Sequence, residues 1–526
     1  MSKLLRKPKT MRSLTSHVGA FKTEHRVLIL SLVLIIAQVP SSASANSRPI
    51  TDLVPADCLV AYIARPYAAP QPTSQPVDIT HASPGSSTIA AILALLDASG
   101  LIPDEGQVFA DIASALPLLG RFEHSMVLLD VSSKMVRRPR GDDDKGQYRI
   151  SLRLKSLQTA ILFRTNGQHR AVLDQLNRII GRYTNVDVAQ LSVERLGGYK
   201  YQRLTDERLP GWAVWEWGRL DGFFVVSFGI GAFEKIATTY AGKRPSLTND
   251  PWFKTATVKT QGGQAMAQCF LALARLEERL GEVAKGRHTR VIKALDADNM
   301  THDLWTIGLQ GRALTWYRCY RRNGEDITRH YSDPATYPPR HRQLVPAEAR
   351  HYAIIRVPTR WLVDNLPRAW MAAQSERQVQ TWRRVWQRLE QEIGIDIDGN
   401  LINHLGDGIV IFDYPPHPLK IPFALTIAIE IDDRHAVQIA VDAVLSAWGK
   451  YLDERATRKG TTWVRVRVHH DSDGVYYLQA GILGPALKVT DNYLVISWNP
   501  LALRDALRFI EEPRASTPDK SPAREI

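Results

Sequence analysis

Cysteine is scarce in this chain, which contains only Cys58, Cys269 and Cys319 among its 526 residues. Three cysteines cannot form the disulfide framework that stabilises small extracellular domains. In an exported chain Cys269 could pair with Cys319, because both lie within predicted strands of the same middle segment. The alternative is three buried, unreactive thiols. The cysteine content leaves this choice open and excludes only a disulfide-rich scaffold.

Short catalytic motifs are also absent. The chain has no Gly-x-Ser-x-Gly, His-Glu-x-x-His or Cys-x-x-Cys sequence, so the usual signatures of α/β-hydrolases, zinc proteases and thiol oxidoreductases are missing. Gly281 and Gly286 have the spacing of a phosphate-binding loop, but Arg287-His288 replaces the required Lys-Ser/Thr pair. We therefore predict no catalytic, cofactor-binding or metal-binding residues and no cofactor, and we favour a protein that is not an enzyme.

The excess of positive charge is small once the N-terminus is set aside. Seven basic residues and one acidic residue within residues 1–45 contribute +6 of the formal +13, which leaves about +7. The remaining basic residues do not gather in one block, so we expect no nucleic-acid partner. Basic patches could contact anionic polymers of a cell envelope, although the sequence does not localise such patches.

Only one apolar run is a candidate membrane segment, and it spans Val27 to Ala37. A basic stretch precedes it and Ala43-Ser44-Ala45 follows it, which is typical of a secretory signal peptide cleaved after Ala45. We therefore predict a signal peptide over residues 1–45 and a secreted or periplasmic protein. The alternative is an uncleaved N-terminal helix, which would be the only membrane anchor.

The rest of the chain is long enough for several domains. Strand-like and helix-like segments separated by Gly turns predict an α+β fold with largely antiparallel sheets. We expect a first module over 50–245 and a middle strand and helix segment over 250–342 whose end, from Tyr331 to Arg342, is a linker. A second module over 343–512 and a disordered tail over 513–526 follow.

The stretch from Ile393 to Asp413 indicates how the modules are built. It predicts a helix end, a Gly turn, a capped short helix, a second Gly turn and a buried strand. A similar order of signals occurs between Gly100 and Asp130.

Further segments match between the two modules in the same order. Leu53 to Asp57 matches Leu344 to Glu348, Met126 to Asp130 matches Ile409 to Asp413, and Asp221 to Phe228 matches Asp491 to Trp498. Matches in a constant order predict two copies of one module. The shared residues belong to turns and core strands, which favours a duplicated fold without a duplicated catalytic site.

Three segments together resemble a known group of proteins. They are Pro55-Ala-Asp57 at the entry to a strand, Gly394 to Asp398 before Leu401-Ile402, and Val489 to Ser497 near the end. These segments are similar to exported bacterial proteins, of a type found in planctomycetes, that carry an internally duplicated domain of unknown function. The resemblance covers most of residues 50–510 and implies an envelope or secreted location with no established activity.

A possible calcium loop precedes the buried strand of the second module. Asp396, Asp398 and Asn400 alternate as calcium ligands do, but Leu401 occupies the position of the required Gly and Asp407 that of the final Glu. A helix cap at Asp398 explains the pattern without a metal ion.

Other polar and aromatic clusters favour structural roles. The run from His469 to Asp473 has metal-binding residue types, but neighbouring strand residues point to opposite faces, which favours a polar hairpin tip. Asp142 to Asp144 similarly predicts a solvated loop. Trp212, Trp215 and Trp217 are expected in one strand, where a ligand platform is conceivable and core packing is favoured.

The leading hypothesis is an exported, non-enzymatic protein of unknown function that acts as a structural or binding scaffold for an envelope component or protein partner. The alternative is an envelope hydrolase with a site between the modules that uses His404, His469 or His470. A solute-binding module is a third interpretation, and it requires the strand from Trp212 to Trp217 to face solvent.

Overall fold

The computed structural model describes residues 48–65, 122–139, 148–183, 189–207, 209–262, 265–280, 299–347, 349, 352–356, 393–413, 425–459, 467–479, 484–497 and 499–511, together with five helical residues between 380 and 391. The predicted signal peptide, the Asp142 to Asp144 loop, the Gly281 to Gly286 segment and the tail at 513–526 lie outside the described residues. Among the described residues, no helix is long and apolar enough to cross a membrane.

Eighteen strands form one connected sheet within the described parts of the chain. They are β1 (Val60–Ala64), β2 (His124–Pro139), β3 (Tyr148–Arg164), β4 (Ala189–Leu196), β5 (Tyr199–Asp206), β6 (Trp215–Leu220), β7 (Phe223–Phe228), β8 (Ala265–Leu271), β9 (Met300–Gln310), β10 (Ala313–Arg322), β11 (Glu325–Ser332), β12 (Tyr352–Arg356), β13 (Leu405–Asp413), β14 (Leu425–Ile431), β15 (Arg467–His470), β16 (Tyr476–Gln479), β17 (Ala486–Val489) and β18 (Tyr493–Ser497).

Helices lie between and after the strands. They are α4 (Arg170–Tyr183), α5 (Ala232–Tyr240), α6 (Pro251–Lys259), α7 (Leu273–Leu280), α9 (Pro339–Arg342), α12 (Ile397–Asn400), α13 (Arg434–Lys459) and α14 (Pro500–Glu511), with 3-10 helices η1 (Ile50–Asp52), η2 (Leu247–Asn249), η5 (Pro334–Thr336) and η6 (Ile402–His404). The expected mixed fold with largely antiparallel strands is confirmed, because the one parallel contact in the described sheet joins Ala313 of β10 to Tyr352 of β12.

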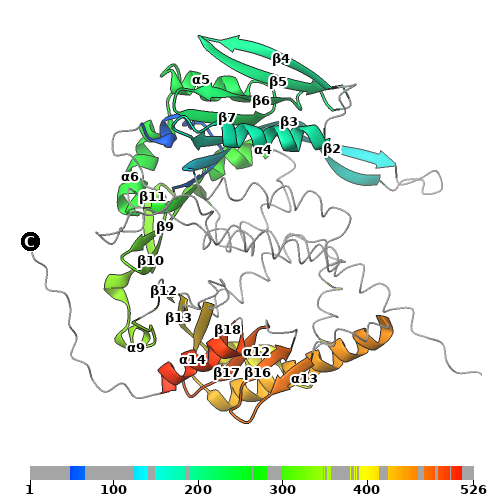
Figure 1. Cartoon of the computed structure of the whole chain (residues 1–526), viewed down its shortest axis with the longest axis vertical. Coiled ribbons are helices and arrows are strands. Elements are labelled where there is room, and N and C mark those ends of the chain that lie inside the picture. The colour runs from blue at the N-terminus through cyan, green and yellow to red at the C-terminus, as the bar shows by residue number, and fades with distance from the viewer. Residues whose placement is uncertain are drawn as a thin grey trace, which may run out of the picture.

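The strands within residues 60–228 and those within residues 352–497 have the same spatial order. In the first, the spatial order is β1-β2-β3-β7-β6-β5-β4. In the last, it is β12-β13-β14-β18-β17-β16-β15. In both, a helix (α4 or α13) follows the third strand and another (α5 or α14) follows the last. Figure 1 shows the two groups at opposite ends of the molecule, with β9 and β10 between them.

Helices cover both faces of the sheet in the first group. On one face α4 packs Val172 and Leu176, one turn apart, against Phe224. On the other face α5 packs Phe233 against the cluster that contains Phe223. Because successive residues of a strand point to opposite faces, the apolar run of β7 is buried between the two helices. Each buried aromatic side chain of this run stabilises the fold by about 1.5–3 kcal/mol.

The second group repeats this layering. Val437 and Val441 of α13 lie in one apolar cluster with Leu494 of β18. Leu503 of α14 lies in a separate cluster with Val495, the next residue of the same strand. The layers therefore follow the same order as in the first group, with the middle helix on one face and the last helix on the other.

The cross-strand pairs show how the two groups align. The first group contains the row Ile63, Ser125, Leu162 and Val225, and the second contains the row Ile354, Val410, Ala428 and Val495. The outer strands agree with the predicted matches. Ile63 lies as far along the chain from Leu53 as Ile354 does from Leu344, and Val225 lies as far from Asp221 as Val495 does from Asp491. The predicted match of Met126 with Ile409 is two residues out of register, because Ser125 occupies the place of Val410.

The middle segment extends the sheet of the first group. β8 pairs with β1, and β9, β10 and β11 follow in order. The segment from Tyr331 to Arg342, which was expected to be a linker, contains the end of β11, η5 and α9. Its polar composition is explained by local bonds: Asp333 accepts a hydrogen bond from the Ala335 N–H at 3.0 Å, and the Tyr337 hydroxyl donates to the Leu314 carbonyl at 2.9 Å.

The stretch from Ile393 to Asp413 follows the predicted order with one correction. Gly394 has a φ of +81°, as expected for a residue that ends a helix, and α12 follows. Gly406 does not form a second turn. It lies within β13, where the pairing with β14 shifts between Leu405 and Ile409.

Candidate anion-binding groove

The acidic loop before β13 is a helix cap. The Asp396 carboxylate accepts a hydrogen bond from the Gly399 N–H at 2.9 Å. The predicted cap at Asp398 is therefore wrong, because Asp398 lies inside α12. In the described part of the chain, no group of three His, Cys, Asp or Glu residues could hold a metal ion.

The His and Asp cluster near residue 470 forms the end of the β15–β16 hairpin. His469 and His470 each stack on a cross-strand partner, Tyr477 and Tyr476. Asp471 accepts two backbone hydrogen bonds of the turn and pairs with an α14 arginine at 2.7 Å. These contacts give the polar residues of the hairpin tip structural partners.

The three tryptophans do not share one strand. β6 begins at Trp215, so Trp212 precedes it. Trp215 is 38% exposed whereas Trp217 is 3% exposed. A solvent-facing platform of all three side chains is therefore wrong.

A disulfide between Cys269 and Cys319 is excluded by the sheet. Strand β9 lies between β8 and β10, and the two cysteines are opposite neighbouring residues of β9, Trp305 and Leu304. They consequently point to opposite faces. The thiols are free, and burial raises the pKa of Cys58 to about 12 and that of Cys269 to about 11.

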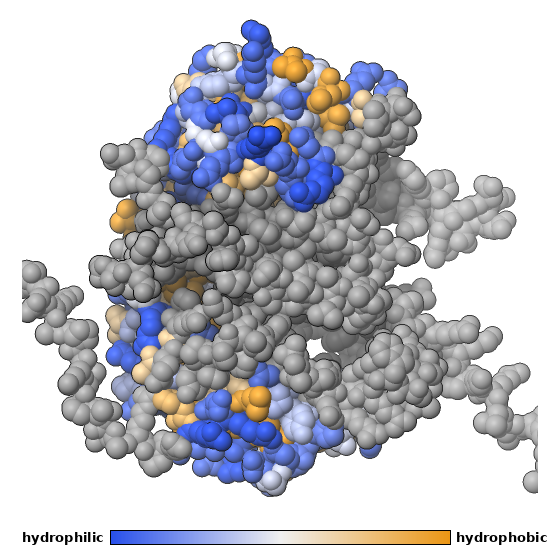
Figure 2. All heavy atoms as spheres, viewed as in Figure 1, coloured by the Kyte–Doolittle hydropathy of each residue, from blue (hydrophilic) through white to orange (hydrophobic). Residues whose placement is uncertain are grey.

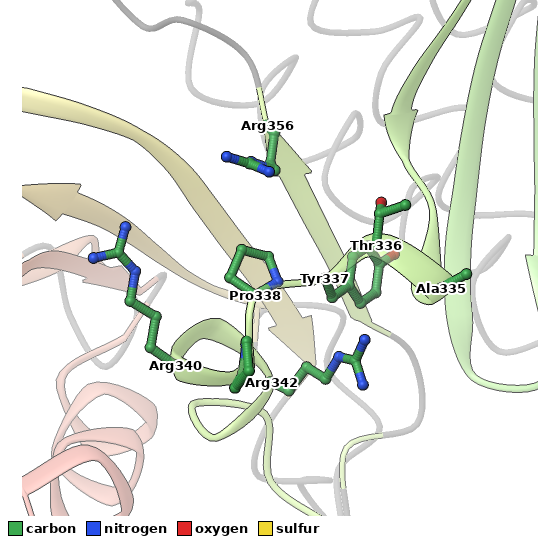
Figure 3. A pocket seen from close by; sticks show the side chains of 8 residues that line it. Ala335, Thr336, Tyr337, Pro338, Arg340, Arg342 and Arg356 are labelled. Carbon is green, nitrogen blue, oxygen red and sulfur yellow. The ribbon is translucent and has the colours of Figure 1, made fainter.

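An open groove lies where α9 meets the ends of β12, β13 and β14. Its outer part is a cavity of about 820 Å³ lined by Arg340, Arg342 and Arg356 together with residues 335–339. Its inner part, about 300 Å³, shares Pro338, Arg340 and Arg356 with the outer part and reaches Glu430. Figure 3 shows the guanidinium groups of Arg340 and Arg356 on one side of Pro338 and that of Arg342 on the other.

The arginines of the groove differ in their partners. Arg340 pairs with Glu430 at 2.6 Å, and Arg342 donates to the Pro334 carbonyl at 3.2 Å. Arg356, the exposed last residue of β12, has no carboxylate of the described residues within ion-pair distance. The outer cavity has no acidic side chain in its lining. This end of the groove therefore presents positive charge that the described residues do not neutralise.

Two other arginines in the described sheet have donors that are already paired with a carboxylate. Arg318 donates from two nitrogens to Asp303, each at 2.9 Å, and Arg203 donates twice to Glu216. Such bidentate pairs use the fork of donors that would otherwise bind a ligand. Among the described residues, no carboxylate occupies the guanidinium donors of Arg356, which makes it the strongest candidate for ligand binding in the groove.

His341 forms the buried wall beneath the arginines. Its side chain is 2% exposed, and neither ring nitrogen makes a hydrogen bond. Its Nε2 atom lies 3.5 Å from the Glu430 carboxylate. Burial lowers the pKa of His341, and the charge of Glu430 partly opposes that shift. The buried ring therefore places two nitrogens without hydrogen bonds next to the groove.

Two glycines of β13 make room for this wall. A Cβ on Gly408 would lie 2.2 Å from the His341 ring, and one on Gly406 would lie 2.8 Å from the Glu430 side chain. The Gly-Asp-Gly sequence at 406–408 is thus a position of close approach. His341, Arg340 and Arg356 were not predicted from the sequence. The only signal for them was a pair of glycines next to a predicted buried strand.

The far end of the inner groove is acidic. Asp407 and Asp432 line it, and the carboxylate of Asp432 lies 2.9 Å from His404 Nδ1. The groove therefore carries positive charge at one end and negative charge at the other. Such an arrangement can orient a ligand that has an anionic group, because a guanidinium binds carboxylate, sulfate and phosphate oxygens through two parallel hydrogen bonds.

No family model matches the chain, and no curated protein matches it. Among solved structures, crystal form III of TP0453 matches 54% of this chain and 83% of its own, at 10% sequence identity and a TM-score of 0.25. Crystal form I of TP0453 matches 54% of this chain and 82% of its own, at 10% identity and a TM-score of 0.24. Similarity at this level carries no argument about fold or function.

Proposed function

We propose that the chain is an exported, non-enzymatic binding protein that takes an anionic ligand in the groove at Arg340 and Arg356. The observation that carries this proposal is Arg356, a guanidinium without a carboxylate partner among the described residues, at the mouth of an acid-free cavity. Export rests on the signal-like residues 1–45 and on the resemblance to exported planctomycete proteins with a duplicated domain of unknown function. An anionic polymer or peptide of the envelope is the corresponding class of ligand.

The proposal includes two copies of one α+β module. Equal strand order, equal layering and rows that agree at Ile63 and Ile354 support this duplication. Within the part of the chain that the structure describes, the groove lies in the second copy, because α9 of the middle segment supplies His341 and Arg340. Ligand binding is therefore a property that was added to one copy by the segment that precedes it.

Calorimetric titration of the full chain with sulfate and with citrate tests the proposal. Arg356→Gln should weaken binding about tenfold, the effect of losing one charge-assisted hydrogen bond. Arg329→Gln is the matched control, because Arg329 is exposed on β11 outside the groove. Equal affinity in wild type and Arg356→Gln would show that the groove is not the anion site.

An envelope hydrolase is the second candidate, and the contact between His404 and Asp432 favours it. A histidine held by a carboxylate at 2.9 Å is the arrangement of a general base, and Asp432 lines the groove. Envelope peptides and glycans incubated with wild type and His404→Ala distinguish the two functions. Hydrolysis that is lost in His404→Ala would replace the binding proposal with the enzymatic one.

A further inference from the structure

A separate pocket of about 500 Å³ lies in the first group of strands, between the start of α4 and the strands β4, β5, β6 and β7. Its lining combines aromatic and aliphatic side chains with a few polar groups, which is the usual composition of a small-molecule site. It shares no lining residue with the groove at Arg356.

Trp217, one of the residues that line this pocket, has a buried donor without an acceptor. Trp217 is 3% exposed, and its Nε1–H makes no hydrogen bond. A buried indole N–H normally has a partner, and leaving one unpaired costs about 1–3 kcal/mol. Trp217 and Phe224 are members of one apolar cluster, and both line the pocket. A ligand with a flat apolar body and an acceptor oxygen would satisfy both features.

Basic residues of neighbouring strands lie at the pocket. Lys200 of β5 and Arg219 of β6 line it, and Arg195 of β4 is paired directly with Lys200. Like charges directly opposite each other destabilise a sheet unless something neutralises them. Among the described residues, none of the three has an acidic side chain within ion-pair distance. Asp221, the one acidic lining residue, already accepts a hydrogen bond from Tyr240.

We propose that this pocket binds a small amphipathic anion. Its apolar body lies on Trp217 and Phe224, an acceptor oxygen receives the Trp217 N–H, and its anionic group contacts Lys200 and Arg219. The site is independent of the groove at Arg356, so either proposal can fail without the other. Figure 2 shows a mainly hydrophilic surface at this end of the molecule, interrupted by hydrophobic patches.

The probe that tests this pocket is anilinonaphthalene sulfonate, an aromatic anion whose fluorescence rises on binding. Its uncharged relative N-phenylnaphthylamine reports the contribution of the apolar body alone. We expect the sulfonate to bind the full chain at one site with about tenfold higher affinity than the uncharged compound, because a charge-assisted hydrogen bond contributes about that factor.

Three variants separate the contributions. Lys200→Glu and Arg219→Glu should each weaken sulfonate binding about tenfold and leave binding of the uncharged compound unchanged. Trp217→Phe keeps an aromatic ring without the donor, so it should weaken binding of the sulfonate less than the charge variants do and leave binding of the uncharged compound, which has no acceptor oxygen, unchanged. Lys254→Glu, at an exposed position of α6, is the charge-matched control. Circular dichroism verifies folding. Sulfonate binding that is unchanged in both charge variants, or that is lost in Arg356→Gln, would overturn the assignment.

Discussion

Helices α4 and α13 cover the same face of their respective sheets, yet the space beneath them is filled differently. Under α13, Tyr476 donates a hydrogen bond to Asp442, and Gln438 donates to the Tyr476 hydroxyl at 2.9 Å. Under α4, the Trp217 N–H has no acceptor and a pocket remains. Similar layers can therefore carry a closed polar network in one place and an open site in another.

The difference lies in side chains that the shared fold does not require. Apolar residues of the central strands, such as Phe224 and Leu494, pack under the helix in both groups. Polar residues at the margin of the same face decide whether it is sealed. If the groups are copies of one module, these polar residues at the margin are the positions at which the functions of the copies diverged. The following experiments test whether the groups behave as comparable units.

The largest expected effect comes from emptying the core beneath the last helix of each group. Phe233→Ala in α5 should lower the free energy of unfolding by about 3–5 kcal/mol, and Leu503→Ala in α14 by about 2–5 kcal/mol, because both side chains are fully buried. In the described sheet, β10 is joined to β12 by one residue pair. We therefore expect two unfolding transitions in calorimetry, and each variant should lower the midpoint temperature of a different one. A single transition lowered by both would refute comparable, separable units.

The second group contains the groove at the ends of β12, β13 and β14. Gly408 tests how closely the wall of this groove is packed. Gly408→Ala should destabilise the chain by about 1–3 kcal/mol, because its Cβ would overlap the His341 ring. Gly449→Ala in α13 is the matched control. The nearest side chain to its Cβ is 3.9 Å away, so the better helix propensity should raise stability by about 0.5–1 kcal/mol. Denaturant titration measures both; equal effects would show that close packing at His341 is unimportant.

Some features of this fold could be predicted from the sequence because they depend on neighbouring residues. The apolar runs of β7 and β18 are typical of buried strands, and both strands are buried along most of their length. Gly197 and Gly198 have φ of +55° and +95°, as their hairpin turn requires. Local chemistry of this kind leaves a signal in a short window of sequence.

The candidate site could not be predicted in this way. The contact of Gly408 with His341 joins residues far apart in the chain, and no periodicity connects them. Strand β11 was missed because its polar residues alternate without a continuous apolar face. Asp396 rather than Asp398 caps α12 because the cap is chosen by the residue whose backbone is still extended, which the sequence of alternating aspartates does not distinguish.

The closed network under α13 should respond to the loss of one hydroxyl. Tyr476→Phe leaves the ring and removes the bridge between Asp442 and Gln438, which should lower stability by about 1–2 kcal/mol. Burial and the neighbouring Asp442 raise the pKa of Tyr476 to about 12. Neutral tyrosine is favoured in the folded state, so this contribution is complete below about pH 10 and is lost as the pH rises towards 12. The wild type should therefore lose more stability than Tyr476→Phe between pH 10 and 12. If the stability of wild type and of Tyr476→Phe changed equally with pH between 10 and 12, the network would contribute nothing.

The smallest expected effect concerns the attachment of α6 to β11, which should belong to the first unit. Asp326 accepts hydrogen bonds from Arg321 at 2.8 Å and from the Trp252 Nε1–H at 2.9 Å. The Arg321 bond is the main reason that its pKa falls to about 2. The folded state thus favours the ionised carboxylate, and this contribution is present above about pH 4 and disappears as the pH falls towards 2. Asp326→Asn should lower stability by about 1 kcal/mol at pH 7 and by almost nothing at pH 2.

Because Trp252 and Phe233 belong to the same core cluster, the transition that Asp326→Asn lowers should be the one lowered by Phe233→Ala. A shift of the other transition would place the middle segment with the second group instead.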